Sequence, residues 1–91
     1  MNANINLYYG VLLNNLDKYN KVFTKNFSVD KSKLKKLKYQ SVAQWDSVGH
    51  MTMIGKLEEI FKITLEMDDI IDFSSYEKGK KILEKYKILI K

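Results

Sequence analysis

The chain has 91 residues, enough for one domain with a single modest hydrophobic core. It contains no cysteine, which excludes disulfides and thiolate chemistry, and one histidine, His50, cannot build a zinc site or a triad by itself. The formal charge of +5 is unevenly spread. Residues 46–72 carry −5, from seven acids and two lysines, and the rest carries +10, from fourteen lysines and four acids. The composition therefore predicts a polarised protein, not a uniformly basic one.

Proline is absent and only four glycines occur, which favours long helices over strands and turns. No lysine or arginine precedes Leu7, and the apolar run over residues 7–13 is short and contains Gly10. The start of the chain therefore does not look like a secretory signal, and no segment is long enough to span a membrane. We expect a cytoplasmic location.

The first periodic segment covers residues 4–23 and predicts a long amphipathic helix. Its apolar residues fall at steps of three or four: Ile5, Tyr8, Leu12, Leu16, Tyr19 and Phe23. Residues 24–45 are less periodic and rich in lysine. Asp30 is a reasonable N-cap for a short helical turn there. A connection this long inside a small domain is often functional, and we expect its apolar residues to hold it across the helix ends.

A second strong helical pattern begins at Asp46-Ser47 and includes Val48, Met51, Ile54, Leu57 and Phe61. Residues 67–73 predict one or two helical turns with Ile70 and Ile71 facing inward. Ser74 or Ser75 then caps a last helix, in which one face holds Tyr76, Gly79, Leu83, Tyr86 and Ile90. The expected fold is all-α: a single domain over residues 1–91. It is a small antiparallel bundle of three main helices, with a short helix before the last and a long loop between the first two.

Ser47 lies where an irregular loop meets the first turn of the second helix. Unpaired backbone N–H groups and the positive end of the helix dipole gather there, so a phosphate on this hydroxyl would be electrostatically favoured. Gly49 is expected to leave space for another surface to approach the serine. An isolated Asp-Ser pair would more simply be a helix cap, and only the surrounding residues argue for more.

Those residues resemble the phosphopantetheine-attachment site of acyl carrier proteins. In that family an Asp-Ser pair opens the second helix, a hydrophobic residue follows, and a Leu-Glu-Glu-x-Phe-x-Ile run closes it. Here these are Asp46-Ser47, Val48, and the run from Leu57 to Ile63. Asp68-Asp69-Ile70 falls where the family has its short third helix. The resemblance covers about residues 44–86 specifically, whereas the first helix and the long loop agree in layout only.

The resemblance implies that a phosphopantetheinyl transferase attaches 4′-phosphopantetheine from coenzyme A to Ser47, with Asp46 assisting the loading. The thiol of this arm then carries an acyl or aminoacyl group as a thioester, which explains why the chain needs no cysteine. The protein itself would catalyse nothing and would bind no metal of its own. It would act as a monomer that meets acyl-loading and acyl-using enzymes through Glu58, Glu59 and Asp69.

Two features depart from the common family pattern, which has a leucine after the serine and an acidic surface overall. This chain has Val48 and a charge of +5. The sequence from Trp45 to His50 looks closer to stand-alone carriers of specialised pathways, such as surface-polysaccharide or secondary-metabolite synthesis, than to the carrier of fatty-acid synthesis.

The remaining residues around the serine have simpler interpretations. Trp45 is expected to anchor the loop against the bundle, and His50 to be a surface or packing residue. Met51, Met53 and Met67 are most simply core residues, although flexible thioethers would also tolerate an acyl chain.

The alternative function is a non-carrier basic helical module that binds nucleic acid or a partner helix. Its support is the lysine-rich loop, which contains Lys31, Lys33, Lys35, Lys36 and Lys38. A nucleic-acid module would gather its lysines on one helix face or groove. Here they alternate with apolar residues, so we expect no nucleic-acid partner.

Overall fold

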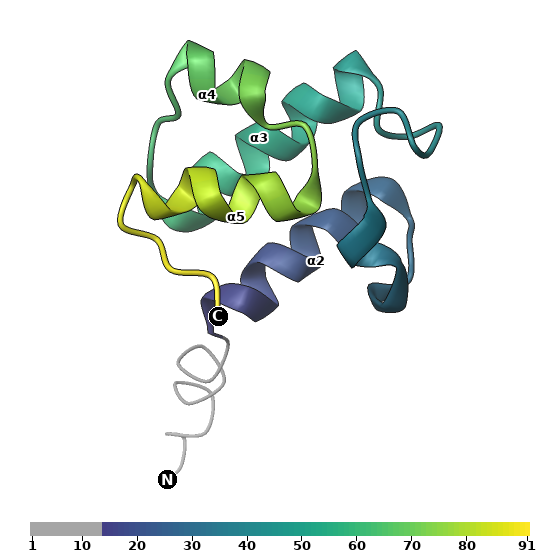
Figure 1. The fold of residues 1–91 in the computed structure, drawn as a ribbon, viewed down its shortest axis with the longest axis horizontal. Helices are drawn as coiled ribbons and strands as arrows, with labels where there is room; N and C mark the ends of the chain where they lie inside the picture. The colour runs from purple at the N-terminus through teal and green to yellow at the C-terminus, as the bar shows by residue number, and fades with distance from the viewer. Residues whose placement is uncertain (1–13) are drawn as a thin grey trace, which may run out of the picture.

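The computed structural model describes residues 14–91, and its regular elements are helical (Figure 1). They are α2 (Asn15–Phe27), the 3-10 helix η1 (Lys31–Lys36), α3 (Ser47–Phe61), α4 (Met67–Asp72) and α5 (Tyr76–Glu84). The predicted all-α bundle is confirmed: α2, α3 and α5 are the three larger helices, and the short α4 precedes the last. The part of the expected first helix before residue 14 lies outside the described residues. Within residues 14–91, no helix is long and apolar enough to cross a membrane.

Helix α2 extends to Phe27, four residues beyond the end that the apolar pattern predicted. The reason is that Tyr19, Phe23 and Phe27 continue one i,i+4 row, and all three are fully buried. Asn14 begins the helix as its N-cap, accepting a hydrogen bond from the Asp17 N–H at 2.8 Å. Ser28 ends it in the left-handed conformation, with φ of 53°.

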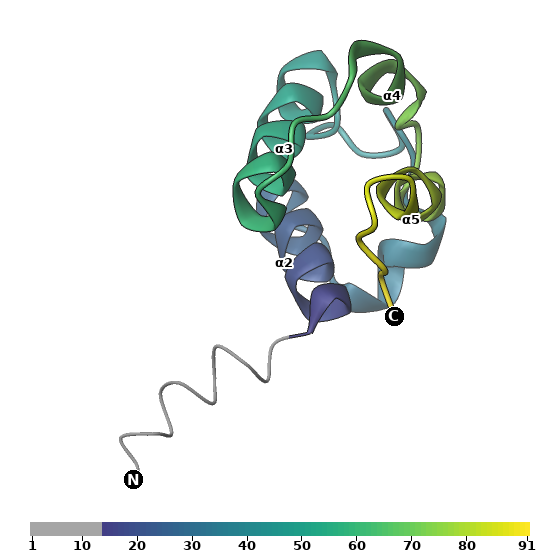
Figure 2. The ribbon, with the colours of Figure 1, turned by 90° about the vertical axis from the view of Figure 1, so that its left-hand side faces the viewer.

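Aromatic packing connects α2 to the segment before α3. The Phe27 ring stacks on the indole of Trp45, with ring centroids 4.8 Å apart and planes 9° from parallel. This contact places the end of α2 beside the start of α3, and the two helices run in opposite directions (Figure 1). Viewed from the side, α2 and α3 form one wall of the bundle and α4 and α5 the other (Figure 2). The fully buried large side chains between them are Trp45, Tyr19, Phe23, Phe27, Phe73, Met53, Ile54, Leu57 and Leu83.

The long connection between α2 and α3 is fixed at both the side-chain and the backbone level. Asp30 caps η1 by accepting a hydrogen bond from the Ser32 N–H at 3.0 Å. Leu34 and Leu37 are buried in the core. The Tyr39 N–H donates to the Ser74 carbonyl at 2.9 Å, so the connection is also joined to the residues before α5. Its expected place across the helix ends is confirmed.

Helix α5 is shorter than its apolar face predicted. It ends at Glu84, and the chain then turns. Lys87 adopts a left-handed conformation, with φ of 65°. The last residues run back toward the start of α2, where the Asn15 side-chain amide donates to the Leu89 carbonyl at 3.1 Å (Figure 1). Of the two candidate caps of this helix, Ser75 is the one used, and its hydroxyl accepts from the Lys78 N–H at 2.9 Å.

Two helical glycines give a matched test of this packing. A methyl group at Gly79 would lie 2.2 Å from the Tyr19 hydroxyl and from the Phe73 ring, whereas a methyl group at Gly55 would meet nothing within 4 Å. In urea denaturation, we expect Gly55→Ala to raise the free energy of unfolding by about 0.5–1 kcal/mol, because alanine is the better helix former. We expect Gly79→Ala to lower it by about 1–3 kcal/mol through overpacking. Similar effects of the two substitutions would contradict the packing of α5 against α2.

Candidate functional site

Ser47 is the first residue of α3, and its side chain is exposed. Asp46 is the N-cap, with its Oδ1 accepting a hydrogen bond from the Gly49 N–H at 2.8 Å. Among residues 14–91, no hydrogen bond engages the Ser47 hydroxyl. The N–H groups of Ser47 and Val48 belong to the first helical turn and have no intrahelical acceptor. The site therefore presents a free hydroxyl beside the positive end of a helix dipole.

The residues on both sides of Ser47 are fixed by two hydrogen bonds in series. Trp45 is fully buried, and its indole N–H donates to Nδ1 of His50 at 3.0 Å. Nε2 of His50 lies 2.8 Å from the Ile70 carbonyl oxygen. Since Nδ1 accepts, the proton of a neutral ring is on Nε2, which donates to Ile70. We call this series the Trp45–His50–Ile70 relay; it joins the loop, α3 and α4.

The relay bears on the expected roles of Trp45 and His50. Trp45 anchors the loop against the bundle, as predicted. His50 is a packing residue, also as predicted, because both of its ring nitrogens are occupied. It therefore has no free nitrogen with which to activate the Ser47 hydroxyl as a general base.

The expected role of Gly49 is wrong. The space beside it is taken by the chain itself, since an added methyl group would lie 1.9 Å from the Gln44 carbonyl oxygen. Glycine is needed at this position so that the loop backbone can cross the first turn of α3, and not to admit a partner.

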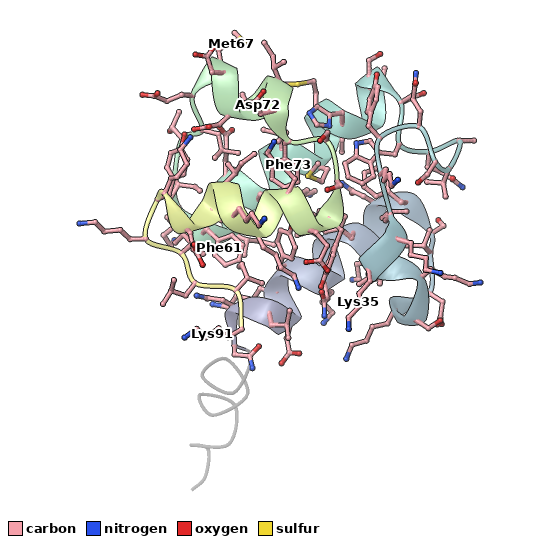
Figure 3. All side chains as sticks on the ribbon, in the orientation of Figure 1. Lys35, Phe61, Met67, Asp72, Phe73 and Lys91 are labelled. Carbon is pink, nitrogen blue, oxygen red and sulfur yellow. The ribbon has the colours of Figure 1, made fainter. Side chains whose placement is uncertain are left out.

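An apolar groove of about 340 Å³ lies beside Ser47, between α3 and α4. Its apolar walls include Met51, which is 53% exposed, and Met67 and Ile71, which are 69% and 70% exposed. In Figure 3, Met67 lies at the outer end of α4, whereas Phe73 points into the bundle. The groove lining is completed by Tyr39, Ser47, His50, Ile70, Phe73 and Ser74.

This groove corrects three sequence predictions. Of the three methionines expected in the core, only Met53 is buried, and Met51 and Met67 face solvent. Ile71 was expected to face inward together with Ile70 and does not. In the six-residue α4 the buried residue is Asp69, and Ile71, which points about 200° away from it around the helix axis, faces solvent. The exposed methionines and Ile71 are groove residues that sequence reasoning missed, and the surplus of apolar residues in so short a helix was the available signal.

The three acids that were expected to contact partners differ in how far their side chains are exposed. Glu59 is exposed. Glu58 is half-buried, and its Oε2 accepts from the Leu65 N–H at 2.9 Å, which fastens the loop after α3. Asp69 is only 5% exposed, so its expected role as a partner contact is wrong. Its carboxylate accepts from the Lys85 ammonium at 2.5 Å and from the Tyr86 hydroxyl at 2.6 Å. The exposed acids of α4 are Asp68 and Asp72.

No protein-family model matches the chain, and neither does any curated protein. The chemistry that the site can perform follows from its own residues. It offers one exposed hydroxyl for covalent attachment, a helix terminus suited to an anion, and an apolar groove beside both.

The Asp69 network predicts a loss of stability in acid. The hydrogen bonds from Lys85, and then from Tyr86, hold the pKa of the Asp69 carboxyl below its ordinary value. A carboxyl whose pKa is lower in the folded than in the unfolded state stabilises the fold above the unfolded value, near 4, and this contribution disappears as pH falls through the folded pKa. We expect the free energy of unfolding, followed by urea denaturation, to fall from pH 5 to about pH 2. Asp69→Asn should reduce this pH dependence, and the control Asp68→Asn, at an exposed position, should retain it. An unchanged pH dependence in Asp69→Asn would contradict the role of the network.

Proposed function

We propose that the chain is an acyl carrier protein. It holds acyl or aminoacyl groups as thioesters on a 4′-phosphopantetheine arm attached to Ser47, and presents them to biosynthetic enzymes. The observation that carries the proposal is the exposed Ser47 hydroxyl, which starts α3 within a sequence pattern that resembles the attachment site of this family. The chain acts as the carrier, and catalysis belongs to its partners.

Attachment at Ser47 is chemically reasonable on three grounds. The hydroxyl is free of hydrogen bonds to residues 14–91, so none has to be broken when it reacts. The phosphodiester formed on it would carry its negative charge next to the N–H groups of the first turn, which favour an anion. The Asp46 cap and the relay hold the backbone on both sides of Ser47, so the hydroxyl is carried at a fixed place on the surface.

Loading forms an O–P bond at Ser47. The serine oxygen displaces the nucleotide part of coenzyme A from phosphorus, and the hydroxyl proton leaves with a base of the transferase, since His50 has no free nitrogen. When bound, the arm supplies the thiol that the chain lacks.

The groove between α3 and α4 supports the same function. Its walls are mostly apolar and it borders Ser47, so it suits the arm or the first carbons of a cargo. Its exposed residues Met51, Met67 and Ile71, near the acids Asp68 and Asp72, offer a surface that an enzyme with apolar and basic residues would recognise. Methionine packs against differently shaped partners easily, which suits a protein that meets several enzymes.

The first test is covalent loading. We expect incubation with coenzyme A, Mg²⁺ and a broad-specificity phosphopantetheinyl transferase to add one arm per chain, detected by intact-mass spectrometry. Ser47→Ala should abolish the mass shift while keeping the helical circular dichroism signal, because the cap is supplied by Asp46. The matched control is Ser74→Ala, which removes another exposed hydroxyl of the same groove. This variant should gain the arm as the unaltered protein does. Loading of Ser47→Ala would refute the attachment site.

A second test separates the two roles assigned to Asp46. Asparagine is as good an N-cap as aspartate, so Asp46→Asn should change the free energy of unfolding by less than about 0.5 kcal/mol. It removes the carboxylate that we expect the transferase to need, so the initial loading rate should fall at least about tenfold, an effect of roughly 1.4 kcal/mol on the barrier. Equal loading rates would leave Asp46 with the cap as its only role.

A further inference from the structure

A second groove, of about 420 Å³, lies between α2 and α3 and is rimmed by lysines. Lys18, Lys21 and Lys25 come from α2, and Lys56 from α3. No acidic residue lines it. Within residues 14–91 none of these lysines forms an ion pair, and residues 1–13 contain no aspartate or glutamate. The rim therefore carries four lysines that have no ion-pair partner among residues 14–91. We call it the lysine groove.

The lysine groove has the layout of a binding site for a helix. The α2 lysines are spaced i, i+3 and i+7, so they follow one helix face for about 10 Å. Val22 on α2 and Ile60 on α3 also line the groove; Ile60 is 38% exposed, and Val22 is 5% exposed. The result is an apolar floor with a basic rim on either side.

Asn26, which also lines this groove, adds a second and independent observation. Its side-chain Nδ2 is buried and has no hydrogen-bond partner among residues 14–91. A buried donor without an acceptor destabilises a fold, and such groups are rare in native proteins. Because the nitrogen itself is buried, a partner carboxylate would satisfy this donor only after the amide turns toward the groove.

The lysine groove lies on a different side of α3 from the Ser47 groove. Lys56 follows Ser47 by nine residues, which places it about 180° around the helix axis. The core residues Met53, Ile54 and Leu57 occupy the face between the two. A partner in the lysine groove would therefore leave Ser47 and its apolar groove accessible.

We propose that the lysine groove binds an acidic amphipathic helix of a partner protein. The apolar stripe of that helix would rest on Val22 and Ile60, and its acids would meet the lysines on both rims. One carboxylate would accept from Asn26. This is the recognition of an amphipathic helix by a hydrophobic groove, with charge complementarity added.

Other anionic partners fit the lysine groove less well. A bilayer is flat and does not fit a concave site. Nucleic acid would gain little from the apolar floor, and among residues 14–91 no aromatic side chain lines the groove for base stacking. The proposal does not depend on Ser47 carrying an arm.

The test is a titration of the ¹⁵N-labelled full-length protein. The probe is a synthetic helical peptide of about 20 residues, long enough to be helical in water, with a leucine stripe flanked by glutamates at i, i+3 and i+7. We expect chemical-shift changes centred on Lys18, Lys21, Lys25, Asn26, Lys56 and Ile60. The same peptide with lysine in place of glutamate should not bind. Changes centred on the Ser47 groove, or equal binding of the two peptides, would overturn the proposal.

Charge reversal supplies the matched control. The double substitution Lys21→Glu and Lys25→Glu should weaken the affinity for the peptide at least about tenfold, because two ion pairs become repulsive contacts. Lys35→Glu with Lys78→Glu makes the same change of net charge at exposed positions outside the lysine groove, and should weaken binding less than about twofold. Equal weakening by the two pairs would show attraction to net charge alone and overturn the site. So would tighter binding of anionic phosphatidylglycerol vesicles, of decanoate or of a DNA duplex than of the peptide.

Asn26→Leu tests the buried donor separately. Removing an amide that lacks an acceptor should raise the melting temperature of the free protein. Losing the hydrogen bond to the peptide carboxylate should weaken the affinity for the peptide. A lower melting temperature together with unchanged peptide affinity would remove Asn26 from the site.

Discussion

The structure depends on the burial of one polar group, the indole N–H of Trp45. A buried donor needs an acceptor, and His50 provides it one turn into α3. This fixes the histidine tautomer, so the second ring nitrogen needs an acceptor too and finds the Ile70 carbonyl at α4. Two hydrogen bonds thereby place the loop, α3 and α4 relative to one another. Ser47 lies in sequence between the first two members of this series, so the two hydrogen bonds hold the backbone on both sides of it.

Much of the fold was predictable because it depends on local signals. Apolar residues at steps of three and four indicated the cores of α2, α3 and α5, and Asp30, Asp46 and Ser75 were recognisable as caps. Helix ends were less predictable, because they depend on tertiary contacts. Phe27 extends α2 since Trp45 stacks on it, and that partner is distant in sequence.

The candidate site was predictable at Ser47 and Asp46 but not in its surroundings. Periodicity identifies an apolar face without telling whether the core or a groove receives it, which is why Met51 was misassigned. The environment of Asp69 depends on Lys85, sixteen residues later, and no local pattern reveals such a pair. The lysine groove also combines two helices, although the i, i+3, i+7 spacing of its α2 lysines was visible in the sequence.

The position of the only tryptophan gives the molecule a built-in optical reporter. Its indole lies two residues before Ser47, stacked on Phe27 and held by His50. Emission from this ring therefore comes from one place, the junction between the loop and α3. The wavelength or intensity of this fluorescence would report a change at Ser47 in real time, without a dye or a label on the chain.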